Sequence, residues 1–487
     1  MKMVNKRIYL AGQTCPTKSW YIRSSGIEIS LTPSQQARID VGVEIGEMAR
    51  TLYPEGILVD EGSNAKNAKK TQQLINNESI TVIFEATFIY GDLVTRTDIL
   101  KRIDGEWHLI EVKSSAASDK IKPDLIDDLA YTTMVLQSCG ITPVKSSLLL
   151  VSKAYRLGMD NNDFFVEIEC TDKVDKRCLD FTLNIDAITK ASGETQRPYP
   201  TMKLACKKCE FYKPECLGKN VDYPIFDLPR LNQKQFNVLF AENISLVSQI
   251  PAEYELSAEQ KLVRSTVKNS EPFINKDKLE KLLGKIIYPA YYLDFESVST
   301  AIPLYPDIGP YEELVTQYSI HKLDTLDGPS EHSEYLADFT KDDRHALAVK
   351  LLADIGTEGS VIVYHAQAEK RFIANLAKAT PALSDELNKV IERIVDLEVI
   401  LRESYYHSAF HGSYSIKVVL PVLVSELSYK NLEIGDGESA INAFADLARG
   451  SYATDEAKAL CNALLRYCEQ DTLAMVRIHQ ELINLLA

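Results

Sequence analysis

The sequence predicts an α/β protein with two α/β regions and a short helical stretch between them. Segments rich in β-branched and aromatic residues alternate with segments whose apolar residues recur at the helical period. This alternation is interrupted between about residues 223 and 285 and then resumes. The chain has 487 residues, a length that as a prior suggests roughly two to four domains. We therefore expect domains at 1–222 and 286–487, with a helical bridge at 223–285.

The first region contains the signals of a helix, a three-stranded antiparallel segment, a second helix and a buried strand. Asp104-Gly105 is a strong signal for a tight hairpin turn between the second and third strands. The expected elements are a helix at 34–52, strands at 80–90, 93–103 and 107–113, a helix at 124–139 and a strand at 146–152. This order of elements is that of an α/β core.

The bridge and the second region follow. Short helical patterns, Pro251 and turn residues characterise the bridge. The expected elements of the second region are an apolar strand at 286–295, a polar strand near 315–322, a helix at 342–355, a strand at 360–364 and helices to the end. The second region is therefore also predicted to be α/β.

Composition and charge limit the possible classes of function. Hydrophobic residues make up 45% and charged residues 25% of the chain, as in ordinary globular proteins. No run of about 18 apolar residues is present, and the apolar stretch at the N-terminus is too short for a signal peptide. We therefore expect a cytoplasmic protein without a membrane partner.

The net charge of −15 is unevenly distributed along the chain. Residues 1–222 carry 29 Lys and Arg against 30 Asp and Glu, and residues 223–487 carry 25 against 39. This disfavours a strong nonspecific binder of duplex nucleic acid. It does not exclude a metal-dependent nuclease, because bound divalent ions supply positive charge at such a site.

Four of the nine cysteines have the spacing of a metal or cluster site. Cys15 lies near the N-terminus, and Cys206, Cys209 and Cys216 lie together near the end of the first region. Three clustered thiols and one distant thiol suit an iron–sulphur cluster that closes a domain. Structural zinc is the alternative, since Cys-x2-Cys with two further cysteines is also a zinc pattern.

Acidic residues lie on the predicted strands between these cysteines. Carboxylates hold the divalent ions that hydrolyse phosphodiesters, so Asp98 and Glu111 are candidate ligands of one ion. Lys113 is two residues after Glu111 and shares its strand face, where it can orient water or stabilise the phosphate. Glu85, on the preceding strand, is a candidate third ligand. The alternative is a solvated amphipathic hairpin without a site.

The second region contains a further acidic constellation. Asp294 and Glu296 are two residues apart on an apolar strand and share one face. Tyr467 and Asp471 are four residues apart in a helical pattern and share one helix face. Together they are candidates for a site that holds two metal ions. The alternative is that these pairs are unrelated polar residues, since each motif is common by itself.

Residues 1–222 resemble the iron–sulphur branch of the RecB-type, PD-(D/E)XK nuclease superfamily, which includes a CRISPR-adaptation nuclease with the same split cysteines. The resemblance implies a restriction-endonuclease-like fold and a 4Fe–4S cluster. Its ligands would be Cys15, Cys206, Cys209 and Cys216. The Asp and (D/E)-x-K motif of the family matches Asp98, Glu111 and Lys113. Gly46 and Thr132 stand where the family often has a metal-binding histidine and a glutamine.

Residues 286–487 resemble the DEDD exonuclease superfamily, whose fold is RNase H-like. Its first motif matches Asp294 and Glu296, and its last motif, Tyr-x3-Asp, matches Tyr467 and Asp471. Glu369 stands in the place of the middle acidic residue. The resemblance implies that the four carboxylates hold Mg²⁺ or Mn²⁺ and that Tyr467 orients the nucleophilic water.

The whole chain resembles a bacterial family of unassigned function in which these two halves are fused. This resemblance implies the pairing of the two domains and supplies no substrate. From the two halves we expect a metal-dependent exonuclease that trims DNA ends, with single-stranded DNA favoured, in repair, recombination or defence. One alternative is an RNA-processing 3′–5′ exonuclease. Another is a nucleic-acid-binding protein in which one nuclease half is degenerate.

Overall fold

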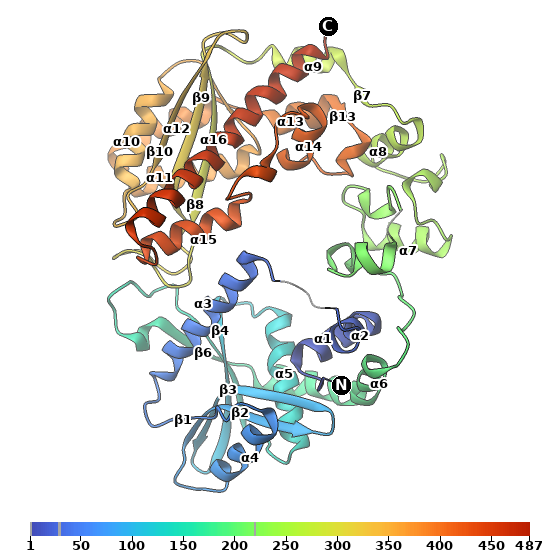
Figure 1. The fold of residues 1–487 in the computed structure, drawn as a ribbon, viewed down its shortest axis with the longest axis vertical. Helices are drawn as coiled ribbons and strands as arrows, with labels where there is room; N and C mark the ends of the chain where they lie inside the picture. The colour runs from blue at the N-terminus through green and yellow to red at the C-terminus, as the bar shows by residue number, and fades with distance from the viewer. Residues whose placement is uncertain (1, 28–30, 219–220) are drawn as a thin grey trace. The chain divides into compact units, whose positions relative to one another are not determined.

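The computed structural model describes residues 2–27, 31–218 and 221–487 (Figure 1). Contacts between residues divide the chain into two units, each with its own sheet. The first unit comprises Met1–Met202, Lys213–Cys216 and Thr300–Glu312, and the second comprises Lys203–Tyr212, Leu217–Ser299 and Glu313–Ala487. The predicted bridge at 223–285 thus groups with the second unit, and the segment at 300–312 groups with the first. The α/β class is as the sequence predicts.

The first unit is built on a six-stranded mixed sheet. Its helices and strands are α1 (Lys6–Thr14), α2 (Pro16–Arg23), α3 (Pro33–Arg50), β1 (Ile57–Leu58), α4 (Asn64–Ile75), β2 (Val82–Tyr90), β3 (Leu93–Ile103), β4 (Glu106–Ala116), α5 (Pro123–Ser138), β5 (Lys145–Val151), β6 (Phe165–Glu169) and α6 (Thr171–Gly193). The strands follow in the order β1-β2-β3-β4-β5-β6. The β1–β2 and β4–β5 pairs are parallel, and the other pairs are antiparallel.

The hairpin between β3 and β4 forms where its turn residues predict. Asp104 and Gly105 have φ values of 53° and 86°. Two successive positive φ angles are those of the tight turn whose twist matches antiparallel strands. Strand β6 was not predicted from the sequence. It lies at the sheet edge and its residues after Phe165 are mostly exposed, so its sequence lacks the apolar pattern of a buried strand.

Both faces of this sheet are covered. Leu100, Leu109 and Leu148 pack on the face covered by α1, α5 and α6. Their neighbours Ile99, Ile110 and Leu149 pack on the opposite face, against α3. Successive side chains of a strand point to opposite faces, and strands buried on both faces are apolar throughout. A polar residue within these strands must therefore have a partner or a role.

The second unit is built on a five-stranded sheet. Its helices and strands are α7 (Gln233–Ala241), α8 (Ala258–Asn269), β7 (Phe273–Ile274), α9 (Lys276–Leu283), β8 (Ala290–Val298), β9 (Leu314–Leu323), β10 (Ser330–Leu336), α10 (Arg344–Ile355), β11 (Ser360–Val363), α11 (Ala366–Ala379), α12 (Ser384–Glu392), β12 (Ile394–Asp396), α13 (Leu397–Ser404), β13 (Tyr405–Tyr406), α14 (Ile416–Leu423), α15 (Gly437–Ala448) and α16 (Thr454–Asn484). The order is β10-β9-β8-β11-β12, and β7 pairs separately with β13.

Strand β8 is central, and helices contact both of its faces. It is antiparallel to β9 and parallel to β11. It begins at Ala290 rather than at residue 286, directly after Pro289, which has no N–H to donate to a ladder. Phe295 contacts Phe372 of α11 on one face, and α16 packs against β8, β9 and β10 (Figure 1). The carboxylates of β8 can therefore meet residues of α16.

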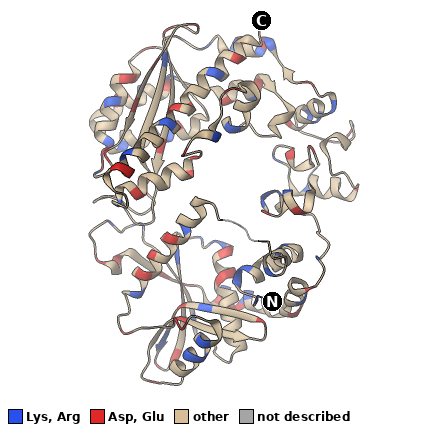
Figure 2. Cartoon of the chain, in the orientation of Figure 1, with Lys and Arg blue, Asp and Glu red and all other residues tan. Residues whose placement is uncertain are grey.

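The lengths of the helices and the distribution of charged residues are relevant to a membrane or nucleic-acid partner. None of the helices in the described residues is both long and apolar enough to cross a membrane. Figure 2 shows acidic and basic residues interspersed on the elements of each unit.

Candidate functional site

Three carboxylates of the second unit lie close together. Asp294 and Glu296 come from β8, and Asp471 comes from α16. One carboxylate oxygen of each lies within 4.8 Å of the other two. The period of two along the strand places Asp294 and Glu296 on one face, and the packing of α16 on β8 brings Asp471 to it. Residues separated by more than 170 positions thus form one acidic group.

Helix α16 supports this group through its buried face. Tyr467 and Cys468 are 4% and 0% exposed, and Asp471 is 7% exposed. The Cys468 thiol donates a hydrogen bond to Oδ2 of Asp294, at 3.6 Å. Tyr467 and Asp471 lie one helical turn apart, as their spacing predicts. The helix therefore contributes a carboxylate, a phenol and a thiol to one place on the sheet.

The electrostatics of the group favour the binding of a cation. Burial, followed by the nearby Asp471 carboxylate, raises the pKa of Asp294 well above its usual value. The same two causes raise the pKa of Glu296 to about 8. Burial also raises the pKa of Asp471, to about 6. Buried like charges repel each other unless they are protonated or neutralised. The donor set, three carboxylates, is that preferred by Mg²⁺ and Mn²⁺.

Lys417 and Tyr429 complete the surroundings of the group. The Lys417 ammonium donates to the Tyr467 hydroxyl, at 3.2 Å, and to the Gly435 carbonyl, at 2.9 Å. The Tyr429 hydroxyl donates to Oδ1 of Asp471. The motifs in the sequence did not connect Lys417 or Tyr429 with the acidic residues, although Lys417 lies in the segment 405–421, whose aromatic residues, hydroxyls and lysine suit contact with a nucleic acid. Single residues on the short elements between α13 and α15 carry no periodic signal that could have found them.

Glu369 lies in the first turn of α11 and is 4% exposed. Its Oε2 atom is buried and has no hydrogen-bond partner among the described residues. Burial, followed by the Glu296 carboxylate, raises the pKa of Glu369 well above its usual value. Glu369 is not one of the three carboxylates that lie within 4.8 Å, but its charge interacts with theirs. It is the fourth carboxylate that faces this site.

The predicted residues of the first unit also lie together. Asp98 is on β3, and Glu111 and Lys113 are on β4. The Val112 N–H donates to Oδ2 of Asp98, at 2.7 Å. Lys113 donates to Oε1 of Glu111, at 3.1 Å, and also binds the carboxylate of Asp128. The Glu-x-Lys motif is therefore an ion-paired unit in the structure.

Lys6 joins this group, and Glu85 lies on the neighbouring strand β2, where its carboxylate is 4.0 Å from Arg50. Lys6, at the start of α1, forms an ion pair with the same Glu111 oxygen that Lys113 binds. The ladder pairs Phe84 with Ile99 and Ala86 with Thr97, so Glu85 lies opposite Asp98 with a φ of 55°. A positive φ is unusual for glutamate and marks a local irregularity of the strand.

The charges of this group are partly balanced. Burial, followed by the Glu111 carboxylate, raises the pKa of Asp98 to about 7. Burial acts to raise the pKa of Glu111, but Lys6 and Lys113 together lower it below its usual value. The Oε2 atom of Glu111 is buried without a hydrogen-bond partner among the described residues. The other oxygen of Glu111 binds two lysines, so among the described residues only Oε2 lacks a donor.

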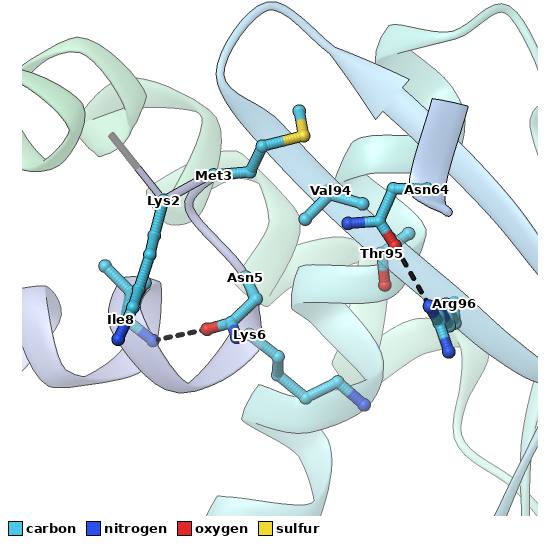
Figure 3. Close-up of a pocket in the computed structure, with 9 residues that line it drawn as sticks. All are labelled: Lys2, Met3, Asn5, Lys6, Ile8, Asn64, Val94, Thr95 and Arg96. Atoms are coloured by element: carbon cyan, nitrogen blue, oxygen red, sulfur yellow. Dashed lines mark hydrogen bonds between the residues drawn. The ribbon is translucent and has the colours of Figure 1, made fainter. Parts of the chain in front are cut away.

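A cavity of about 650 Å³ is lined by residues of α1, α4 and β3 and by the segment before α1 (Figure 3). Lys2, Lys6 and Arg96 are among the residues that line it. Arg96 is held by a hydrogen bond to Asn64, at 3.0 Å. Because Lys6 lines the cavity and also binds Glu111, the cavity and the acidic group share a residue. Cations in such a position suit the phosphates of a nucleic acid.

The four predicted cluster cysteines lie in two short regions. Cys15 is the N-cap of α2, and its sulphur accepts a hydrogen bond from the Lys18 N–H, at 3.4 Å. Cys206 lies in a 3-10 helix at Leu204–Lys208, which Cys209 ends. Cys216 lies in a π-helical turn at Tyr212–Leu217. Cys15 and Cys216 group with the first unit, and the other two group with the second.

A family model described as a domain of unknown function, DUF2779, matches residues 291–415. The match begins on β8 and ends just before α14, so it includes Asp294, Glu296 and Glu369 but not Tyr467 or Asp471. The comparison with curated proteins found no match.

Proposed function

We propose that the chain is a metal-dependent nuclease that trims DNA ends, with single-stranded DNA favoured, and that its main site is the acidic group of the second unit. The observation that carries this proposal is the meeting of Asp294, Glu296 and Asp471 within 4.8 Å. Their raised pKa values add that burial and mutual repulsion outweigh the nearby Lys417 ammonium, so that the group favours a further positive charge. Two-metal sites that hydrolyse phosphodiesters place carboxylates in this way.

The fold supports this proposal. The antiparallel strands β10, β9 and β8 continue into the parallel strands β11 and β12. The last helix, α16, packs on β8, as expected for an RNase H-like sheet. We therefore propose an RNase H-like fold of the DEDD exonuclease type for the second unit.

Each residue of the site has a role that its contacts support. Asp294, Glu296 and Asp471 would hold the divalent ions, with Glu369 as the fourth carboxylate. Bound ions would supply the positive charge that stabilises the attacking and leaving oxygens.

Burial, followed by Asp471, raises the pKa of Tyr467, so its hydroxyl stays protonated. It can therefore orient a water molecule but cannot remove a proton from it. The ammonium of Lys417 lies beside this hydroxyl and is suited to contact a phosphate.

For the first unit we propose a PD-(D/E)XK nuclease-like fold that contacts nucleic acid through Lys2, Lys6 and Arg96. Two alternative functions are proposed for its acidic group. The position of Asp98, Glu111 and Lys113 on adjacent strands supports a second nuclease site. The ion pair between Lys6 and Glu111 favours a binding platform without cleavage, because an ammonium already neutralises the carboxylate that would bind the metal.

The cysteines Cys15, Cys206, Cys209 and Cys216 are proposed to hold a 4Fe–4S cluster, with zinc as the alternative. Contacts within the first unit support this. Arg197 donates to the Tyr21 hydroxyl of α2, at 2.8 Å, and to the Glu215 carbonyl, at 3.0 Å. Cys15 caps α2 and Cys216 follows Glu215, so one arginine links the segments that carry the first and the last cysteine.

The test is degradation of end-labelled substrates by the purified full-length chain with Mg²⁺ or Mn²⁺. Single-stranded DNA, duplex DNA and RNA are compared, with either end labelled. We expect shortening of single-stranded DNA from the 3′ end that chelation and Asp294→Asn both abolish. Preference for RNA would select the RNA-processing alternative. Binding of all substrates without cleavage would leave only the nucleic-acid-binding alternative.

A further inference from the structure

A second group of metal-ligating side chains lies on the edge of the sheet in the second unit. His321 of β9 and His332 of β10 are directly paired in the antiparallel ladder. Their ring centroids are 4.7 Å apart. Glu469 of α16 joins them, and one ligand atom from each of the three residues lies within 4.8 Å of the others. None of these residues belongs to the Asp294, Glu296 and Asp471 group.

A network of hydroxyl groups assigns the ring protons of both histidines. Thr472 Oγ1 lies 3.0 Å from the Glu469 carbonyl and 3.5 Å from the Cys468 carbonyl, and when it donates to either of these oxygens its single proton is used there. His321 Nδ1, which lies 2.8 Å from Thr472 Oγ1, must then donate to it. Ser319 lies 2.9 Å from Thr472 Oγ1 and must also donate to it. The Ser319 oxygen therefore accepts from Nε2 of His332, at 2.9 Å.

This assignment leaves one lone pair on each ring. His321 has its lone pair on Nε2, and His332 has its lone pair on Nδ1. His332 Nδ1 lies 3.9 Å from Oε1 of Glu469, too far for a hydrogen bond. Metal-ligating histidines typically donate their other ring N–H to an oxygen acceptor, which fixes the tautomer. Both histidines have that outer hydrogen bond here.

Glu334 places a further carboxylate near His332. Glu334 follows His332 by two residues on β10 and so shares its face. Its Oε2 atom lies 4.0 Å from His332 Nε2 and is buried without a hydrogen-bond partner among the described residues.

We propose that His321, His332 and Glu469 bind a transition-metal ion of the zinc class at a site separate from the Asp294 group. Two imidazoles and one carboxylate are a donor set that suits Zn²⁺ and not Mg²⁺. The side chains of His332 and Glu469 are 24% and 44% exposed, so an ion can enter from solvent. The bound ion would tie α16 to β9 and β10 and thereby hold the helix that carries Tyr467 and Asp471.

The test is a titration of the full-length protein with Zn²⁺, followed by calorimetry and by elemental analysis of the bound metal. The variants are His332→Gln, on the edge strand, and Glu469→Gln, which keeps the shape of the side chain. Glu481→Gln on the same helix is the matched control. Circular dichroism checks the fold of each variant. If one site variant fails to fold, the other site variant still tests the proposal.

We expect the wild type and Glu481→Gln to bind one more equivalent of Zn²⁺ than either site variant, or to bind it at least about tenfold more tightly. Co²⁺ in place of Zn²⁺ should give a visible ligand-field absorption in the wild type that both site variants lack. Equal stoichiometry and equal affinity in the wild type and all folded variants would overturn the proposal. Zinc bound elsewhere, for example at the cysteines, is bound equally by the wild type and the variants and therefore does not affect the difference between them.

Discussion

Replacing Asp471 by asparagine removes one charge from the buried carboxylates of the second unit while keeping the shape of the side chain. The pKa of Asp471 is raised from 3.8 to about 6 in the folded protein. A shift of about two units corresponds to about 3 kcal/mol. Because the folded-state pKa is the higher one, ionisation of Asp471 destabilises the fold. That loss of stability develops as the pH rises from about 4 to about 6 and persists above it.

In the absence of divalent metal, Asp471→Asn should therefore raise the free energy of unfolding at pH 7.5 by up to about 3 kcal/mol. At pH 4 the same change should have little effect, since the wild-type carboxyl is largely protonated in the folded state. Divalent metal should stabilise the wild type by binding the folded state, and it should stabilise the variant much less. Cleavage should fall by ~10²-fold or more, because a ligand of the metal site is lost.

Urea unfolding at pH 4 and pH 7.5, with and without Mn²⁺, measures these differences. The chain has two units, so two transitions are expected, and the one that Mn²⁺ shifts belongs to the second unit. Glu481→Gln, on the same helix but outside the acidic group, is the control and should leave that transition unchanged. If Asp471→Asn unfolds at the same urea concentration as the wild type at both pH values, the carboxylates do not destabilise one another. An equal shift by Mn²⁺ in both proteins would show that Asp471 holds no metal.

Three further changes test the other parts of the structure. Tyr467→Phe should slow cleavage on the labelled-end gel by about tenfold, less than Asp471→Asn, because the hydroxyl orients water and does not bind metal; equal losses would contradict this role. Lys113→Ala should destabilise the first unit by about 1–3 kcal/mol in a proteolysis assay, because Asp128 loses its contact with Lys113 while Glu111 keeps Lys6, and it should remove only the activity of that unit. Unchanged protease resistance in Lys113→Ala would show that the ion pairs add no stability. Cys209→Ala should lose the visible absorbance and the iron of protein purified without oxygen, and a colourless wild type with about one zinc per chain would favour the zinc alternative.

Much of the local structure follows from short-range patterns in the sequence. The strand predicted at 93–103 is β3, and the turn at Asp104-Gly105 forms as its residues require. These features depend on propensities that act over a few residues. Strand β10 carried no such signal, because its sequence is polar and it lies at the sheet edge. The helix at 342–355 begins at Arg344, within the usual uncertainty of a helix end.

The sequence by itself determined the α/β class, the spacing of Asp294 and Glu296 on one strand face, and that of Tyr467 and Asp471 on one helix face. Only the tertiary structure decided which distant residues meet them. Lys6 binds Glu111 across 105 positions, Lys417 reaches Tyr467 across 50, and the pair of His321 and His332 meets Glu469 only through the packing of α16. The physical reason is that periodicity reports which face of an element is buried. The partner of that face is chosen by packing and charge across the fold, and a single lysine or histidine leaves no periodic trace of it.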